Sequence, residues 1–105
     1  MSKLTVSSSI FRATLEQAQF VAECANLRNI RTPQGKWDDQ WWGWEDAATG
    51  GGGCRITWAD GVAWVSRHSG YAYADITEDV CEIFAHMGCK PTTGRNPRIY
   101  GYQGK

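Results

Sequence analysis

The sequence predicts a single small α+β domain spanning residues 1–105, and three observations lead to this fold class. The chain has 105 residues, which is enough to enclose one modest hydrophobic core. Hydrophobic residues make up 42% and charged residues 21%, a composition typical of globular proteins. Segments of alternating polarity occur beside segments of helical periodicity, so the chain should form both strands and helices.

The first predicted elements are a strand and a helix. Residues 3–12 mix β-branched and small polar residues, a pattern typical of a strand. Thr14 then offers a helix N-cap, and Gln17 stands three residues later as in a capping box. The expected helix covers residues 15–29. Its polar residues form one narrow stripe on a helical wheel, so we expect it to be covered over much of its circumference.

Residues 31–53 interrupt this periodicity and are interpreted as an insert within the domain. The insert opens with a Thr-Pro-Gln-Gly turn signal at residues 32–35 and ends with the glycine run 50–53. Between them lies the Trp-rich segment, residues 37–46, which contains four of the six tryptophans of the chain. We expect this segment to be a loop or a short extra strand.

Residues 54–68 predict a β-hairpin. Two alternating runs flank Asp60-Gly61, the preferred pair for a type I′ turn of two residues. The turn sets the register, and side-chain alternation then divides the hairpin into two faces. The predicted core face carries Cys54, Ile56, Trp58, Ala63 and Val65. The other face carries Arg55, Thr57, Trp64, Ser66 and His68.

A second helix and a last strand complete the predicted order. Thr77 is the expected N-cap of a helix over residues 78–87, and Gly88 is its expected end. Residues 98–102 could form the last strand. The order β-α-β-β-α-β predicts a ferredoxin-like sheet, with both helices on one face and the Trp-rich insert outside it. On the helix expected over residues 78–87, the predicted core stripe consists of Val80, Ile83, Phe84 and Met87.

The net charge of zero conceals an uneven distribution along the chain. Residues 1–36 carry five basic and two acidic side chains, a formal charge of +3. Residues 37–82 carry two basic and nine acidic side chains, or −7, and residues 83–105 carry four basic and no acidic ones, or +4. Such an acidic middle between basic ends bears on the choice of partners and not on the fold.

The sequence predicts a cytoplasmic protein with free thiols. No stretch resembles a signal peptide, and none approaches the roughly 18 apolar residues of a membrane span. In a reducing compartment cysteines remain free, and free cysteines are mostly buried. We therefore expect at least three buried thiols among Cys24, Cys54, Cys81 and Cys89.

No motif predicts an enzyme, a metal site or a cofactor. Cys81, His86 and Cys89 do not have a standard zinc spacing, and on one helix Cys81 and His86 would lie roughly 140° apart. The chain lacks a Gly-x-Ser-x-Gly elbow and a phosphate-binding loop. A cysteine-dependent enzyme, pairing Cys24 with His68 or His86, is the least favoured hypothesis because no pattern brings these residues together.

The leading hypothesis is a non-enzymatic protein-binding module, an inhibitor or an adaptor, that docks on a basic surface of another protein. Tryptophan is enriched at interface hot spots, and carboxylates around aromatic anchors suit a basic partner. The same rings could instead bind carbohydrate, or the segment could fold back as a hydrophobic lid. The predicted partner-binding residues are Trp37, Asp38, Asp39, Trp41, Trp42, Trp44, Glu45 and Asp46.

The alternative hypothesis is a binder of single-stranded nucleic acid. Residues 61–65 partly resemble the third-strand motif of RNA-recognition modules, which stack bases on sheet aromatics. Asp60, Val62 and Arg67 depart from that motif at its basic position and at both outer aromatic positions. Trp64 on an open face could still stack a base unless another segment covers it. The predicted residues are Arg55, Trp64, His68, Arg95 and Arg98.

Overall fold

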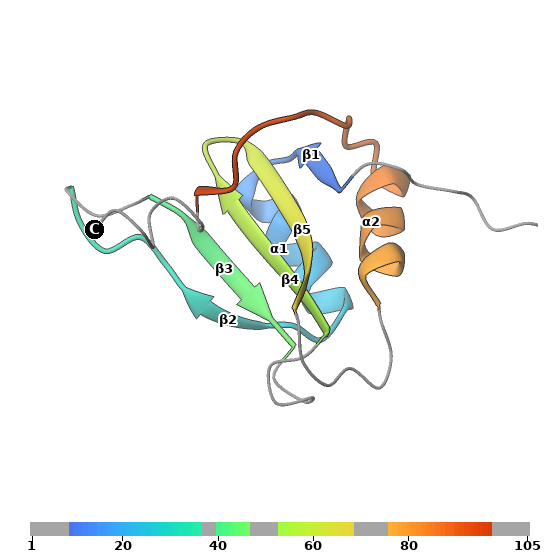
Figure 1. Ribbon diagram of the computed structural model, residues 1–105, viewed down its shortest axis with the longest axis horizontal. Coiled ribbons are helices and arrows are strands. Elements are labelled where there is room, and N and C mark those ends of the chain that lie inside the picture. Colours follow the sequence, from blue (N-terminus) through green and yellow to red (C-terminus); the bar gives the residue numbers. More distant parts are fainter. Residues whose placement is uncertain (1–8, 37–39, 47–52, 69–75, 98–105) are drawn as a thin grey trace, which may run out of the picture.

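The computed structural model describes residues 9–36, 40–46, 53–68 and 76–97. They form one small α+β domain with a five-stranded antiparallel sheet in the order β1-β5-β4-β3-β2. Helix α1 lies behind the sheet and α2 lies beside β5, so that both pack on one face (Figure 1). The elements are β1 (Ile10–Arg12), α1 (Leu15–Cys24), β2 (Arg28–Arg31), β3 (Trp42–Glu45), β4 (Gly53–Ala59), β5 (Val62–His68) and α2 (Thr77–His86).

The predicted hairpin is confirmed as the pairing of β4 with β5. Asp60 and Gly61 both have positive φ, 50° and 82°, as a type I′ turn requires. Ile56 lies opposite Val65, and Ala59 lies opposite Val62, which is the predicted register. Strand β1 adds to the outer side of β5, and β3 adds to the outer side of β4.

The predicted core face of this hairpin is buried under the two helices. Cys54, Ile56 and Ala63 have no exposed surface. From β1, Phe11 stacks on Phe84 of α2 with ring centroids 5.3 Å apart. The remaining helix residues of this core are Ala18, Val21 and Ala22 from α1, and Val80 and Cys81 from α2.

The start of α1 is as predicted, but its end is five residues earlier than expected. Thr14 Oγ1 accepts from the Gln17 amide at 3.1 Å, and Gln17 Oε1 accepts from the Thr14 amide at 2.9 Å, which completes the capping box. The helix ends at Cys24 because Asn26 adopts a φ of 60°. The Leu27 amide then donates to a carbonyl five residues back, forming a Schellman motif.

Helix α2 spans nearly the predicted residues and ends as expected at Gly88, whose φ is 86°. Its N-cap is Ile76, so the prediction that Thr77 is the N-cap is wrong by one position. No helix in the described part of the chain is long and apolar enough to cross a membrane.

The ferredoxin-like strand order is not confirmed. Residues 28–31, expected as the end of a helix and the start of an insert, form β2, and residues 42–45 form β3. The insert therefore contributes β3 to the sheet, in agreement with the extra-strand interpretation of the Trp-rich segment, whereas β2 precedes the predicted insert except for Arg31. The predicted last strand, residues 98–102, lies outside the described residues. In the described segment after α2, Pro91 makes an isolated bridge to Phe11 of β1.

The sheet face opposite the helices is covered in its centre. The segment that follows α2 passes the β1 edge and comes down in front of β5 (Figure 1). It is tied to β1 by the Arg12 amide, which donates to the Lys90 carbonyl at 2.8 Å, and by the Thr92 amide, which donates to the Ile10 carbonyl at 2.9 Å. Helix α1 is less covered than expected, because Phe20 is 52% exposed on its outer side.

We expect Gly61→Val to lower the free energy of unfolding by roughly 1–2 kcal/mol or more, because a β-branched residue is penalised at positive φ. A Cβ on Gly61 would meet no atom within 4 Å, so the cost comes from the backbone alone. Gly35→Val is the matched control, since Gly35 has equal space and no positive φ. Equal denaturant midpoints for the two variants would contradict the turn assignment.

A second prediction concerns the thiols, which are free in all four cysteines, with only Cys24 exposed. Burial, followed by the nearby Glu78 charge, raises the pKa of Cys81 to about 11, and burial raises the pKa of Cys89. We expect brief alkylation of the native protein at neutral pH to give one adduct, at Cys24, by mass spectrometry. Rapid modification of a second cysteine would show that the core opens readily.

Candidate functional site

Trp64, the centre of the predicted nucleic-acid site, is only 8% exposed. Its indole N–H donates to the Gly94 carbonyl at 3.3 Å. Gly94 lies against the ring, since a Cβ on it would be 3.7 Å from the Trp64 Cζ2 atom. The segment after α2 thus covers the ring, and a base could stack on it only if this segment moved.

The structure joins one residue of each predicted site into an ion pair. Arg55 Nε lies 2.5 Å from Glu45 Oε1, and both side chains are 18% exposed. The two residues stand directly opposite each other on β4 and β3, which fixes the geometry of the pair. Their charges offset each other, so neither contributes a net charge to a binding surface.

Trp41 and Trp44 are part of the packed interior, with 6% and 4% exposed surface. A Cβ on Gly43 would stand 2.9 Å from Trp41 Cζ3, so the absence of a side chain at Gly43 lets the ring lie against the sheet. The Arg31 guanidinium lies 4.2 Å from the Trp41 ring centroid, a cation–π contact. Within the described part of the Trp-rich segment, these rings therefore stabilise the β2–β3 extension.

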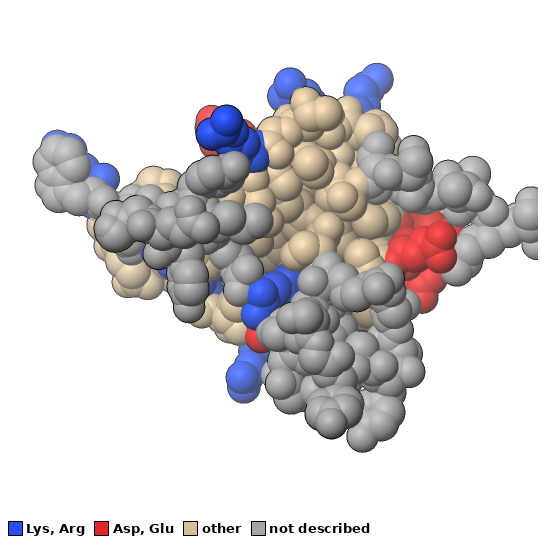
Figure 2. Space-filling view, in the orientation of Figure 1, with Lys and Arg blue, Asp and Glu red and all other residues tan. Residues whose placement is uncertain are grey.

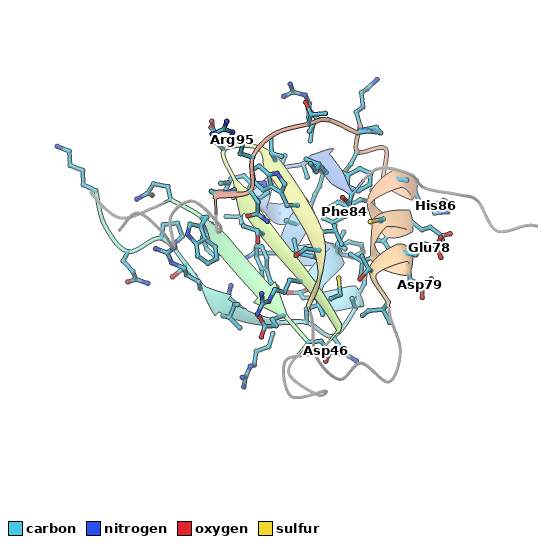
Figure 3. All side chains as sticks on the ribbon, viewed as in Figure 1. Asp46, Glu78, Asp79, Phe84, His86 and Arg95 are labelled. Atoms are coloured by element: carbon cyan, nitrogen blue, oxygen red, sulfur yellow. The ribbon has the colours of Figure 1, made fainter. Side chains whose placement is uncertain are left out.

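The structure brings Trp42 beside Trp44 but does not gather the other described residues of the two predicted sites. Trp42 is half-buried and stacks on Trp44 with centroids 6.0 Å apart. Asp46 follows the end of β3, whereas Arg95 is exposed on the segment after α2, and Figure 3 shows them at different ends of the sheet. His68 ends β5. The predicted residues Trp37, Asp38, Asp39 and Arg98 lie outside the described residues.

Sequence reasoning missed a cleft of about 290 Å³ between the end of α1 and the start of α2, which we call the helix groove. Its apolar walls come from Ala25, Ile76, Val80 and Ile83. Three exposed residues also line it: Cys24, Asn26 and Asp79. The signal that could have revealed it is the apolar pair Ile76 and Ile83, seven residues apart on one side of α2.

The outer surfaces of the two helices are acidic. Together α1 and α2 contain five carboxylates and no Lys or Arg. Figure 2 shows an acidic patch over α2, where Glu78 and Asp79 point away from the sheet (Figure 3). Acidic residues in a first turn also stabilise a helix through its dipole. Glu23 lies in the last turn of α1, where that dipole disfavours a carboxylate, so helix stability does not explain it.

A second cleft, of about 510 Å³, lies at the start of α1. Thr14, Gln17 and the Trp58 ring contribute to its lining. The polar groups of Thr14 and Gln17 are engaged in the capping box, and Trp58 Nε1 donates to the Ala13 carbonyl at 2.8 Å. We assign this cleft a structural role, because these bonds fix the start of the helix.

The described residues contain no cluster of metal ligands, and the Cys81 thiol is buried. No group of three His, Cys, Asp or Glu side chains within them could hold a metal ion. Cys81 is buried and its pKa is raised to about 11, so its thiol stays protonated at neutral pH, while His86 is exposed on the outer side of α2 (Figure 3).

The burial of Trp41 generates a prediction that separates structure from binding. Trp41→Ala should lower the free energy of unfolding by roughly 3–5 kcal/mol, the usual cost of truncating a buried Trp. Trp42→Ala is the matched control and should cost less, because Trp42 is half-buried. Denaturant melts of both variants provide the measurement. If Trp41→Ala lowered the free energy of unfolding less than Trp42→Ala does, the result would support the interpretation of the Trp-rich segment as an exposed interface.

In the described part of the chain, the helix groove thus lies beside helix surfaces whose exposed charged side chains, apart from His86, are all carboxylates. Both belong to the helical layer, on the side of the sheet away from Trp64. Comparison with models of known protein families, with curated proteins and with solved structures finds no match for this chain.

Proposed function

We propose that this chain is a non-enzymatic protein-binding module, an inhibitor or an adaptor, that docks on a basic surface of a partner protein. The observation that carries the proposal is the sign of charge on the helical layer. All five charged side chains of α1 and α2, apart from His86, are carboxylates, and four of them are exposed. Such a one-signed surface steers a partner of opposite charge and raises its association rate.

The helical layer supports this proposal better than the Trp-rich segment does. Within the described part of that segment Trp41 and Trp44 are buried, Trp42 is half-buried, and Glu45 is paired with Arg55. The nucleic-acid alternative depended on an open Trp64 ring, and the ring is covered. Three arguments therefore favour a protein partner that approaches the helices: the exposed carboxylates, the absence of Lys and Arg there, and the cleft between the helices.

Neutralising the helix carboxylates provides the test. The variant Glu23→Gln, Glu78→Gln, Asp79→Asn should retain less of the partner from native cell extract than the parent does. Once the partner is identified, the variant should associate with it roughly tenfold more slowly than the parent does at low ionic strength. This difference between the two association rate constants should shrink as salt is added. Circular dichroism melts verify that the variant still folds.

The control variant carries Arg12→Gln, Lys90→Gln and Arg95→Gln, three exposed cations that do not belong to either helix. Partner association should be unchanged or faster in this variant, because the repulsion of a basic partner is reduced. The proposed function would be wrong if this variant lost binding while the carboxylate variant kept it. Retention of nucleic acid with a steep salt dependence would instead support the alternative hypothesis.

A further inference from the structure

We propose that the helix groove accepts one apolar side chain from a basic segment of the partner protein. This inference rests on the proposed function and specifies where on the helical layer the contact is made. Its basis is the combination, at one place on the surface, of an apolar cleft, an adjacent exposed aromatic ring and exposed carboxylates.

The groove is held open by the way in which the two helices end and begin. At the end of α1, the Schellman motif holds Asn26 at positive φ and turns the chain away from the helix. At the start of α2, Ile76 is the N-cap, and its side chain lines the groove before the first helical turn. Because backbone hydrogen bonds fix both walls, the cleft does not require a partner in order to form.

The size and lining of the groove favour a side chain over a cofactor. At about 290 Å³ it lies at the lower limit of ligand pockets, which are typically about 300–1,000 Å³. Ile76 and Ile83 are only partly buried by the protein core, so they retain apolar surface that a partner can cover. Asp79 supplies the charged group among the lining residues.

The apolar surface continues from the groove along α1. Phe20 is 52% exposed and lies one turn before Cys24, so these two side chains are neighbours on the helix. A large exposed aromatic ring beside a cleft is the arrangement that protein interfaces favour at their centre. The occupant can therefore contact the ring with one side chain while it inserts another into the groove.

The charge around the groove selects the occupant. Glu23 precedes the groove residue Cys24, Glu78 precedes the groove residue Asp79, and all three carboxylates are exposed. In a segment with an apolar side chain flanked by Lys or Arg, the apolar side chain would fill the cleft and the cations would lie near the carboxylates around it. An acidic segment would be repelled by those carboxylates. We therefore assign the groove to a basic segment of a second protein.

The test uses a short synthetic peptide in which a central Leu is flanked by Lys and Arg, and a matched peptide in which Ser replaces that Leu. The Leu peptide should shift backbone amide signals of residues 24–26 and 76–83 in two-dimensional NMR spectra, and it should slow alkylation of Cys24. The Ser peptide carries the same charge but has no apolar side chain to insert, so both effects should be at least several-fold weaker.

Two variants locate the contact on the groove. Ala25→Leu adds a side chain inside the cleft and should abolish protection of Cys24 by the Leu peptide. Asp79→Asn should weaken peptide binding roughly twofold to fivefold, as expected for one exposed charge pair. Asp60→Asn, at the hairpin turn, removes one carboxylate from a different surface and should leave binding unchanged. If Ala25→Leu fails to fold, the comparison of Asp79→Asn with Asp60→Asn still tests the proposal.

Three outcomes would overturn the inference. Equal effects of the Leu and Ser peptides would mean that charge alone is recognised, and amide shifts away from the groove would place the contact elsewhere. Protection of Cys24 that rises with protein concentration and without peptide would assign the groove to a second copy of this chain. In each case the proposed function survives if the carboxylate variant still slows association with the native partner, so the two failures are distinguishable.

Discussion

The type I′ turn at Asp60-Gly61 is the constraint on which the rest of the structure depends. It sets the register of β4 against β5, and a shift of one residue would move every side chain of the hairpin to the opposite face. The other strands build outward from this pair, β1 on one side and β3 followed by β2 on the other. The turn therefore determines that Ile56 lies under the helices and that Trp64 lies on the opposite face. Without that assignment neither the core nor the covered front of the sheet would form.

Local chemistry explains which elements could be predicted from the sequence. The hairpin, the capping box at Thr14 and the end of α2 at Gly88 all depend on residues within a few positions of one another. The end of α1 could not be predicted in the same way, because Asn26 tolerates both helical and left-handed backbone and tertiary pairing decides between them. Strand β2 was missed for the same reason. Its residues pair with residues of β3 that lie twelve to seventeen positions later in the chain, and no local sequence pattern indicates that pairing.

The predicted binding residues show a different limit of the sequence. A cluster of tryptophans indicates large apolar area, but composition does not say whether the rings face solvent or the sheet. The burial of Trp41 depends on Gly43 of β3 having no side chain and on Arg31, from the neighbouring strand β2, lying over the ring. Likewise, the acidic charge was correctly located in the middle of the chain. The sequence does not show that acidic residues gather on the helices. Glu23 belongs to the basic residues 1–36, and only the fold places it in the same layer as Glu78 and Asp79.

These features together restrict where the proposed partner could bind. The front of the sheet is occupied at its centre by the segment around Gly94, and the back is occupied by the helices. The free edge, β2, carries Arg28 and Arg31 and a bulge at Ile30, devices that discourage pairing with another strand. As far as the structure describes the chain, the outer side of the helices combines exposed Phe20, an open groove and a carboxylate at the unfavourable end of α1. Glu23 lowers the stability of α1, because the helix dipole disfavours a carboxylate in the last turn. This cost is a physical reason to propose that Glu23 acts in binding a basic partner.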